Sequence, residues 1–414
     1  MNSNPSRSNE SINAMTIAVL GTLDSKGHEH AFVADLIRNK GHEVLLIDLG
    51  SGGAPQITPD ITRFEVAAAI DLDFQSLIDK QDRGECVVAM SKAAPVYLSK
   101  LVEEGKIDGV ISLGGGGGTA LATAAMRTLP VGFPKLMVST LASGNTAHYV
   151  GTKDITMMPS IVDVAGLNRI SKTIFTRAAG AICGMVEAQV TEGHDKPLIV
   201  ASMFGNTTDC INIAAKVLEE AGYEVLIFHA TGTGGRTMES LIESGMVAGV
   251  LDLTTTEWAD ELLGATLTAG PERMDAMSKA GIPAVIAPGC LDMANYGERQ
   301  TLPAEHEDRN IYIHNPQVTL LRTNAEECSQ LGRILAEKAN ANSAPTAILN
   351  PRKAISIISV EGQSFHDPAA DAALFNAIHE HAQCEVIDYD EEINSETFAQ
   401  AAAHKLLSLI KSQS

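Results

Sequence analysis

The feature of this chain that most constrains its fold is an internal duplication. Residues 15–50 and 197–235 each show an apolar strand pattern, a polar loop, an amphipathic helix pattern, a glycine and a second apolar strand pattern. Three residue pairs keep one spacing of 181 positions: Ile17 and Leu198, Gly41 and Gly222, and Ile47 and Phe228. A β-α-β unit implies parallel strands joined by a right-handed crossover. The repeat therefore predicts an α/β fold of two Rossmann-like lobes with parallel sheets.

The correspondence resumes further along the chain, where residues 105–119 (GKIDGVISLGGGGGT) match residues 245–259 (GMVAGVLDLTTTEWA) at a spacing of 140. The first lobe thus carries about 41 extra residues, which we predict to form additional helices. We expect a disordered tail at residues 1–14, a first lobe at 15–192 and a second lobe at 193–414. The second lobe is expected to end in one more β-α-β unit, within Lys353–Asn394, and a final helix.

Charge and cysteine content exclude several classes of function. Lys and Arg total 30 against 51 Asp and Glu, which gives a net charge of −21. Such a field repels nucleic acids and anionic membranes, so we expect neither as a partner. The six cysteines show no C-x-x-C spacing, and no segment has the pattern of a signal peptide or a membrane span. A reducing cytoplasm is the expected location.

Loops rich in Gly, Ser, Thr and Asn follow most of the predicted strands. In parallel α/β sheets, ligands bind at the carboxyl ends of the strands, where such loops offer N–H groups and hydroxyls to anions. We therefore predict a small anionic ligand, bound in a cleft between the lobes. The candidate binding residues are Gly115, Gly116, Gly117, Gly118, Thr119, Ser143, Gly144, Asn145, Thr146, Gly205, Asn206, Thr207, Thr208, Gly232, Gly234, Gly235, Arg236 and Lys26.

The five consecutive glycines Gly114 to Gly118 allow two explanations. Glycine is unfavourable inside regular structure, so each one needs a reason. The turn could require positive φ or very close packing of helix on strand. Alternatively, its bare N–H groups could hold an anion at a helix N-terminus.

Charged residues in the loops supply candidates for phosphate binding and proton transfer. Arg236 could hold a phosphate with two hydrogen bonds, and Lys26 lies in the first predicted loop. Glu257 and Asp292 are the candidate catalytic residues, as general bases or as ligands of Mg²⁺. Neither a Walker A motif nor a dinucleotide-binding G-x-G-x-x-G occurs in the expected context, which disfavours P-loop NTPases and ordinary dehydrogenases.

The loop sequences also resemble those of a known family. GGGGGT, STLASGNT, MFGNTT, FHATGTGGR, LDLTTTEWAD, LDMANYG and HNPQVTLLRTN are similar, in this order, to the amino-terminal ATP-binding domain of the tomato mosaic virus resistance protein and its bacterial relatives. The resemblance extends from about Met15 to Ile410. It implies two Rossmann-like lobes, ATP as ligand and self-association into a homo-oligomer. In the plant protein a barrel-like domain follows, so a separate barrel-domain protein is a candidate partner.

Three functions remain open at this point. The chain could be an ATP-binding protein, with Mg²⁺ as a further cofactor. It could instead be an enzyme of small-molecule catabolism that acts on a phosphorylated or carboxylic metabolite. A third possibility is a two-lobed sensor that closes around its ligand.

Overall fold

The computed structural model describes residues 14–80, 82–189 and 196–413. The chain divides into two compact units, Met1–Thr191 and Glu192–Ser414, called here the first and the second unit. The predicted tail lies outside the described residues except for its last position. Within the part of the chain that is described, no helix is long and apolar enough to cross a membrane.

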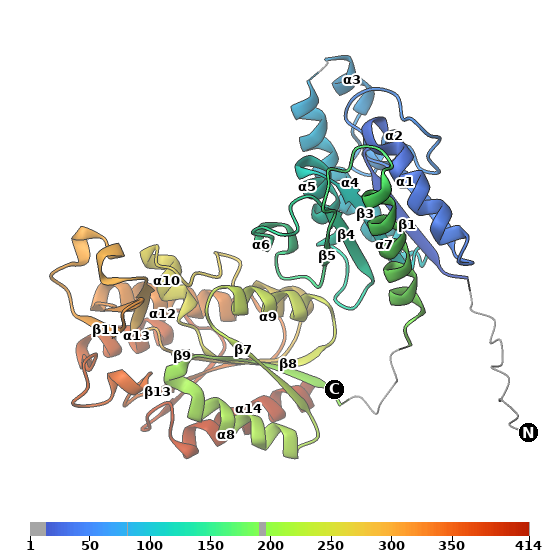
Figure 1. The fold of residues 1–414 in the computed structure, drawn as a ribbon. Coiled ribbons are helices and arrows are strands. Elements are labelled where there is room, and N and C mark those ends of the chain that lie inside the picture. Colours follow the sequence, from blue (N-terminus) through green and yellow to red (C-terminus); the bar gives the residue numbers. More distant parts are fainter. Residues whose placement is uncertain (1–13, 81, 190–195, 414) are drawn as a thin grey trace, which may run out of the picture. The chain divides into compact units, whose positions relative to one another are not determined.

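The first unit is built on a parallel five-stranded sheet with the order β2-β1-β3-β4-β5 (Figure 1). Its strands are β1 (Thr16–Gly21), β2 (Glu43–Asp48), β3 (Gly109–Gly114), β4 (Lys135–Ser139) and β5 (Thr156–Pro159). The central strand β3 is buried along its whole length, because helices cover both faces of the sheet.

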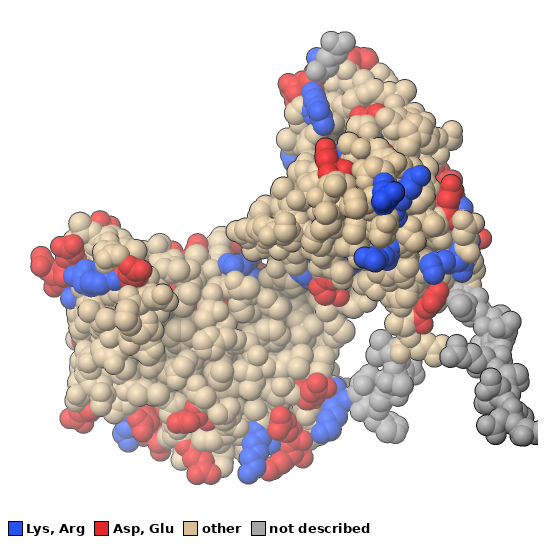
Figure 2. Space-filling view, viewed as in Figure 1, with Lys and Arg blue, Asp and Glu red and all other residues tan. Residues whose placement is uncertain are grey.

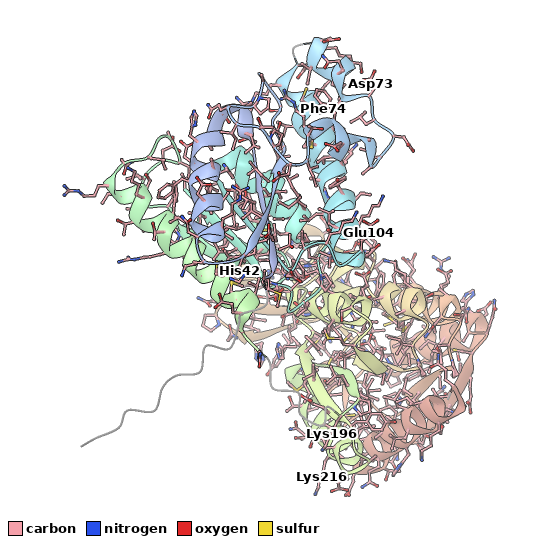
Figure 3. The ribbon with its side chains drawn as sticks, turned by 90° about the vertical axis from the view of Figure 1, so that its right-hand side faces the viewer. His42, Asp73, Phe74, Glu104, Lys196 and Lys216 are labelled. Carbon is pink, nitrogen blue, oxygen red and sulfur yellow. The ribbon has the colours of Figure 1, made fainter. Side chains whose placement is uncertain are left out.

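Two apolar layers hold the helices of the first unit on the sheet. α1 (Leu23–Arg38) and α7 (Arg169–Glu187) share one layer, and α4 (Arg83–Glu103) and α5 (Gly116–Met126) share the other. The extra residues form α4 with the short helices α2 (Arg63–Ala68) and α3 (Phe74–Asp79), as predicted. His42, labelled in Figure 3, lies 2.8 Å from Glu187 through Nε2 and ties the start of β2 to the end of α7.

The second unit contains a parallel six-stranded sheet with the order β14-β13-β9-β8-β6-β7. The strands are β6 (Leu198–Met203), β7 (Glu224–His229), β8 (Val247–Thr254), β9 (Ala284–Gly289), β13 (Thr346–Pro351) and β14 (Glu385–Tyr389). Two helices, α8 (Thr208–Glu220) and α14 (Glu396–Gln413), pack in one layer. The other layer contains α9 (Thr233–Glu243), α10 (Glu257–Leu263), α11 (Asp275–Ala280), α12 (Ala325–Ala341) and α13 (Pro368–His381).

A small antiparallel sheet was not predicted from the sequence. It has the order β10-β12-β11, with β10 (Met293–Tyr296), β11 (Ile311–Asn315) and β12 (Val318–Arg322). The closing β-α-β unit is β13-α13-β14, so its first strand precedes the predicted segment. Lys353–Val360 forms instead a loop with one 3₁₀ turn, Ile357–Ser359.

Backbone geometry confirms the duplication. Gly41 and Gly222 both follow the first helix of their unit with φ near +95° (94° and 97°). Gly105 and Gly245, 140 positions apart, are likewise both left-handed. The first strand departs by one position, because Ile17 lies opposite Val44 whereas Ile199 lies opposite Val225. The α/β class, the parallel sheets and the two lobes are therefore as predicted.

Candidate functional site

The glycine-rich turn of the first unit connects β3 to α5. The helix begins at Gly116, and no side chain caps its N-terminus. None of the five glycines has a positive φ. Only Gly114 is closely packed, since a Cβ there would lie 3.0 Å from the Gly118 Cα. Gly116 and Gly117 are exposed, and a Cβ at Gly117 would meet no other atom within 4 Å.

Thr119, by contrast, has a structural contact. Its side chain is fully buried, and its Oγ1 lies 2.7 Å from the Ser139 Oγ. This hydrogen bond ties α5 to the end of β4. The hydroxyl predicted to face a ligand is thus used within the fold.

A pocket of about 530 Å³ lies beside this turn, at the carboxyl ends of β4 and β5. It is lined by Ser139, Thr140, Ser143 and residues 159–163. The Thr140 N–H donates to the Gly114 carbonyl at 3.2 Å, so the pocket wall and the glycine turn are directly joined. Of the predicted residues, Ser143 lines the pocket.

Gly144, Asn145 and Thr146 lead away from Ser143 into the short helix α6 (Ala147–Val150). The Asn145 Oδ1 accepts the Ala147 N–H at 3.1 Å, as a turn-forming side chain does. These three residues are neighbours of the pocket in the chain, and their role as ligand contacts stays a prediction.

Lys26 and Glu29 contact the residues that directly follow the pocket segment 159–163. The Lys26 ammonium group donates to the Val164 carbonyl, and the Glu29 carboxylate, from the same helix, accepts the Gly166 N–H. Residues 159–163 carry no glycine, so the loop pattern did not single them out. In the structure, this segment is marked by the unusual backbone of Ile161. It is a β-branched residue with a φ of 65°, and it is 72% exposed.

In the second unit the glycine-rich loop before α9 already binds an anion, which is a side chain of the protein itself. The N–H groups of Gly232 and Gly235 donate to the Glu257 Oε1 at 2.7 and 3.0 Å. Close packing against backbone atoms also requires glycine at positions 232 and 234. A Cβ at Gly232 would lie 2.5 Å from the Thr268 carbonyl oxygen, and one at Gly234 would lie 1.8 Å from the His229 carbonyl oxygen.

Glu257 belongs to a buried ion cluster centred on Arg273, which is 2% exposed. The Arg273 Nε donates to Glu257 at 2.7 Å, and its two Nη atoms donate to Asp252 at 2.7 and 2.8 Å. Glu239 accepts a further bond at 3.1 Å. Burial alone would lower the pKa of Arg273, but Asp252 and Glu257 raise it well above its ordinary value, whereas burial raises the pKa of Glu239.

Arg236 lies outside this cluster. It is exposed, and it donates to the Thr268 carbonyl at 2.8 Å and to the Thr233 hydroxyl at 3.4 Å. Both acceptors are neutral, so its charge has no partner in these contacts. Its predicted role in phosphate binding remains a prediction.

The loop after β6 is held within the second unit. Thr207 is buried and its hydroxyl lies 2.8 Å from that of Thr254. The Asn206 amide lies 3.6 Å from the Met293 sulfur, and the Thr208 hydroxyl donates to the carbonyl oxygens of Phe204 and Gly205 at 3.3 Å. Gly205 is exposed in open space.

Asp292, the second candidate catalytic residue, is fully buried. Its Oδ2 accepts the Ser356 hydroxyl at 2.6 Å, and its Oδ1 has no hydrogen-bond partner among the described residues. Burial raises the pKa of Asp292 to about 6. In the described part of the chain, no group of three or more His, Cys, Asp or Glu side chains is placed to hold a metal. The structure therefore offers no metal cluster built on Glu257 or Asp292 there.

On the second unit, the charged side chains that Figure 2 shows lie mainly toward the left and lower margins of the view, and a broad area without Lys, Arg, Asp or Glu lies between them. On the first unit, several Lys and Arg side chains lie near one another on this face, with Asp and Glu side chains around them (Figure 2).

The class of protein is defined by two α/β units. Each contains a parallel sheet with loops at the carboxyl ends of its strands. Residues 15–191 match the N-terminal domain, and residues 196–410 the C-terminal domain, of the uncharacterised protein family UPF0261. The chain belongs to the UPF0261 family, which confirms the resemblance seen in the loops.

Relatives match the chain over most of its length. The UPF0261 protein of Clostridium tetani is 48% identical over 399 residues, which cover 95% of this chain and 99% of that protein. The ToMV resistance protein Tm-1(GCR237) of Solanum lycopersicum is 35% identical over 426 residues, covering 96% of this chain and 56% of the plant protein. Among solved structures, a UDP-N-acetylglucosamine 2-epimerase from Rickettsia bellii matches 66% of this chain and 78% of its own, with 11% identity and a TM-score of 0.22.

Proposed function

We propose that the first unit binds a phosphate-bearing ligand, ATP in the first place. The phosphate oxygens accept hydrogen bonds from the N–H groups of Gly116 to Gly118, and the pocket beside them takes the rest of the ligand. The observation that carries this proposal is the open turn. Four glycines, Gly115 to Gly118, stand where neither φ nor close packing requires them.

Electrostatics support an anion at this position. The first N–H groups of a helix have no partner within it, and the helix dipole adds about half a positive charge there. The 11-residue α5 has no capping side chain that would take these donors. In a chain of net charge −21, such a local donor group is what a polyanion needs.

The residue type at this position is also what a ligand requires. Glycine at the start of a helix brings the backbone closer to a bound phosphate than any residue with a Cβ can. Glycine destabilises the helix, but it allows a phosphate to approach the backbone N–H groups. ATP is the ligand that the family resemblance implies. The two alternative functions, an enzyme of small-molecule catabolism and a two-lobed sensor, remain predictions. So do the cleft between lobes, the homo-oligomer and the barrel-domain partner.

The proposal is tested by placing a carboxylate in the turn. Isothermal titration of the full chain with ATP compares the wild type, Gly117→Glu and Gly184→Glu. Gly184 is the matched control, because it is an exposed glycine within a helix of the same unit, and a Cβ added there would meet no other atom within 4 Å.

We expect Gly117→Glu to weaken binding at least about tenfold, equivalent to about 1.4 kcal/mol, through repulsion of the phosphates. Gly184→Glu should bind as the wild type does, since it adds the same charge elsewhere. Wild-type affinity in Gly117→Glu, or the absence of ATP binding in the wild type, would refute the proposal.

A further inference from the structure

The pocket of the first unit has an unusual set of polar groups for a site that receives an anion. Its side-chain donors and acceptors are all oxygen atoms, four hydroxyls and the carboxylate of Asp163. None of the eight lining residues is Lys or Arg. The ammonium of Lys26 is nearby in the fold but donates to the Val164 carbonyl.

The turn that carries Asp163 is firmly held. The Ser160 N–H donates to the Ser139 carbonyl at 3.1 Å, which fixes it to β4. The Ser160 hydroxyl donates to the Val162 carbonyl at 2.6 Å, and the Val162 N–H donates to the Ser160 carbonyl at 2.8 Å. These bonds hold the turn around Ile161, whose φ is 65°, and Asp163 directly follows this turn in the pocket wall.

Three of the pocket's oxygen-bearing side chains are free of internal partners. Within the described residues, Thr140, Ser143 and Asp163 make no side-chain hydrogen bond or ion pair, whereas Ser139 and Ser160 do. A carboxylate with one or two hydroxyls is a set of hard oxygen ligands, which Mg²⁺ prefers.

We propose that Asp163 holds a divalent cation of the magnesium class that enters together with the phosphate-bearing ligand, with the Thr140 and Ser143 hydroxyls beside it. This inference rests on the proposed function. Mg²⁺ is commonly held by one or two carboxylates plus phosphate oxygens and water, and it resolves the conflict of an anionic ligand beside an anionic side chain. The cation site is complete only when phosphate is present.

The experiment uses Mn²⁺ as a paramagnetic probe with the full chain. Water-proton relaxation is measured with Mn²⁺ alone and with Mn²⁺ plus ATP, for the wild type, Asp163→Asn and Asp308→Asn. Asp308 is the control, since it is an exposed aspartate of the second unit. Titrations with ATP in Mg²⁺ and in EDTA accompany these measurements.

We expect the wild type and Asp308→Asn to form a ternary complex with Mn²⁺ and ATP, and to bind ATP about tenfold more tightly in Mg²⁺ than in EDTA. Asp163→Asn should lose both effects and bind ATP in EDTA as tightly as the wild type, or more tightly. If Asp163→Asn keeps the cation effect, or if the wild type shows none, the inference is overturned while the proposed function stands. If the wild type binds no ATP under either condition, the proposed function fails as well.

Discussion

Each unit has a glycine-rich segment at the start of a helix, and the two segments differ in the partners of their N–H groups. In the second unit, the N–H groups of Gly232 and Gly235 hold the carboxylate of Glu257. In the first unit, the turn before α5 has no capping side chain and open space around Gly117. A similar composition thus takes part in an internal ion cluster in one unit and forms an uncapped, open turn in the other, where we propose that an anion binds.

The duplication makes this contrast sharper. At the spacing of 140 that relates the two units in this region, Gly117 corresponds to Glu257. The second unit has its own anion at this position, neutralised in part by Arg273. The first unit has a glycine there and so has no carboxylate at this position. Glycine content alone therefore does not identify a ligand site, because a side chain of the protein can occupy the N–H groups, as Glu257 does in the second unit.

The largest expected effect is the loss of stability when the buried cation Arg273 is removed. Arg273→Met leaves two buried carboxylates, Asp252 and Glu257, and the partly buried Glu239 without their partner, and breaking a buried ion pair costs about 3 to 5 kcal/mol. Urea unfolding followed by the fluorescence of Trp258, the single tryptophan, reports the second unit. Arg236→Met, at an exposed arginine, is the control and should change stability by less than about 0.5 kcal/mol. A loss below about 1 kcal/mol in Arg273→Met would mean that the cluster does not stabilise the unit.

The next effect tests whether packing requires the second unit's glycines. Gly234→Ala places a Cβ 1.8 Å from the His229 carbonyl oxygen, which is backbone and cannot rotate away. We expect a loss of about 2 to 3 kcal/mol in the same unfolding assay. Gly205→Ala, where space is open, should be nearly neutral. Equal stability of the two variants would remove the packing argument.

The buried carboxyl groups of the second unit predict its response to pH. Burial raises the pKa of Asp292 to about 6 and that of Asp260 to about 7. Because the folded state binds these protons more tightly than the unfolded state, their contribution to stability is complete below about pH 4 and is lost as pH rises through 6 to 7. At about 1.36 kcal/mol per pKa unit, these shifts correspond to about 3 kcal/mol for Asp292 and about 4 kcal/mol for Asp260.

Asp292→Asn should abolish the part of this pH dependence that lies between about pH 4 and pH 6, because the amide does not titrate. Unfolding free energies at several pH values between 4 and 8, read from Trp258, measure the slope. A variant curve parallel to that of the wild type would show that Asp292 has an ordinary pKa in the folded state.

The smallest effect is a gain. Gly117→Ala adds a Cβ in open space and replaces glycine in the first turn of a helix, so we expect a gain of about 0.5 kcal/mol in local stability. Hydrogen exchange of peptides from α5 measures it. We expect slower exchange in Gly117→Ala and a loss of stability in Gly234→Ala. Together, these results would show that packing requires glycine at position 234 but not at position 117. Faster exchange would show that the turn needs Gly117 for its own structure.

The fold could be predicted from the sequence because its signals are local. The apolar strand patterns and the positive-φ glycines Gly41 and Gly222 recur at a fixed spacing, and both mark β-α-β units. The small sheet β10-β12-β11 escaped prediction because its strands are short and lie outside the repeat. The first strand of the closing β-α-β unit was predicted too late in the chain, because the stretch Ala354–Val360 is also apolar. The strand lies at Thr346–Pro351, and Ala354–Val360 forms a loop.

The site was predicted only in part, because its partners are distant in the chain. Composition singled out Gly232 and Gly235 as anion-binding, and they do bind an anion, but nothing local shows that it is Glu257. Arg273 was missed because its acidic partners lie 16 to 34 positions away. The pocket wall at 159–163 was missed because it lacks the glycines and threonines by which loops were chosen.

The most direct test of the account observes both glycine segments in one experiment. The full chain is labelled with ¹⁵N at glycine only, which limits the amide spectrum to 35 residues, and is titrated with ATP. Gly→Ala variants assign the signals. We predict that the amide signals of Gly116, Gly117 and Gly118 move on titration while those of Gly232 and Gly235 stay in place. Movement of Gly232 and Gly235 with unchanged Gly116 to Gly118 would contradict the account.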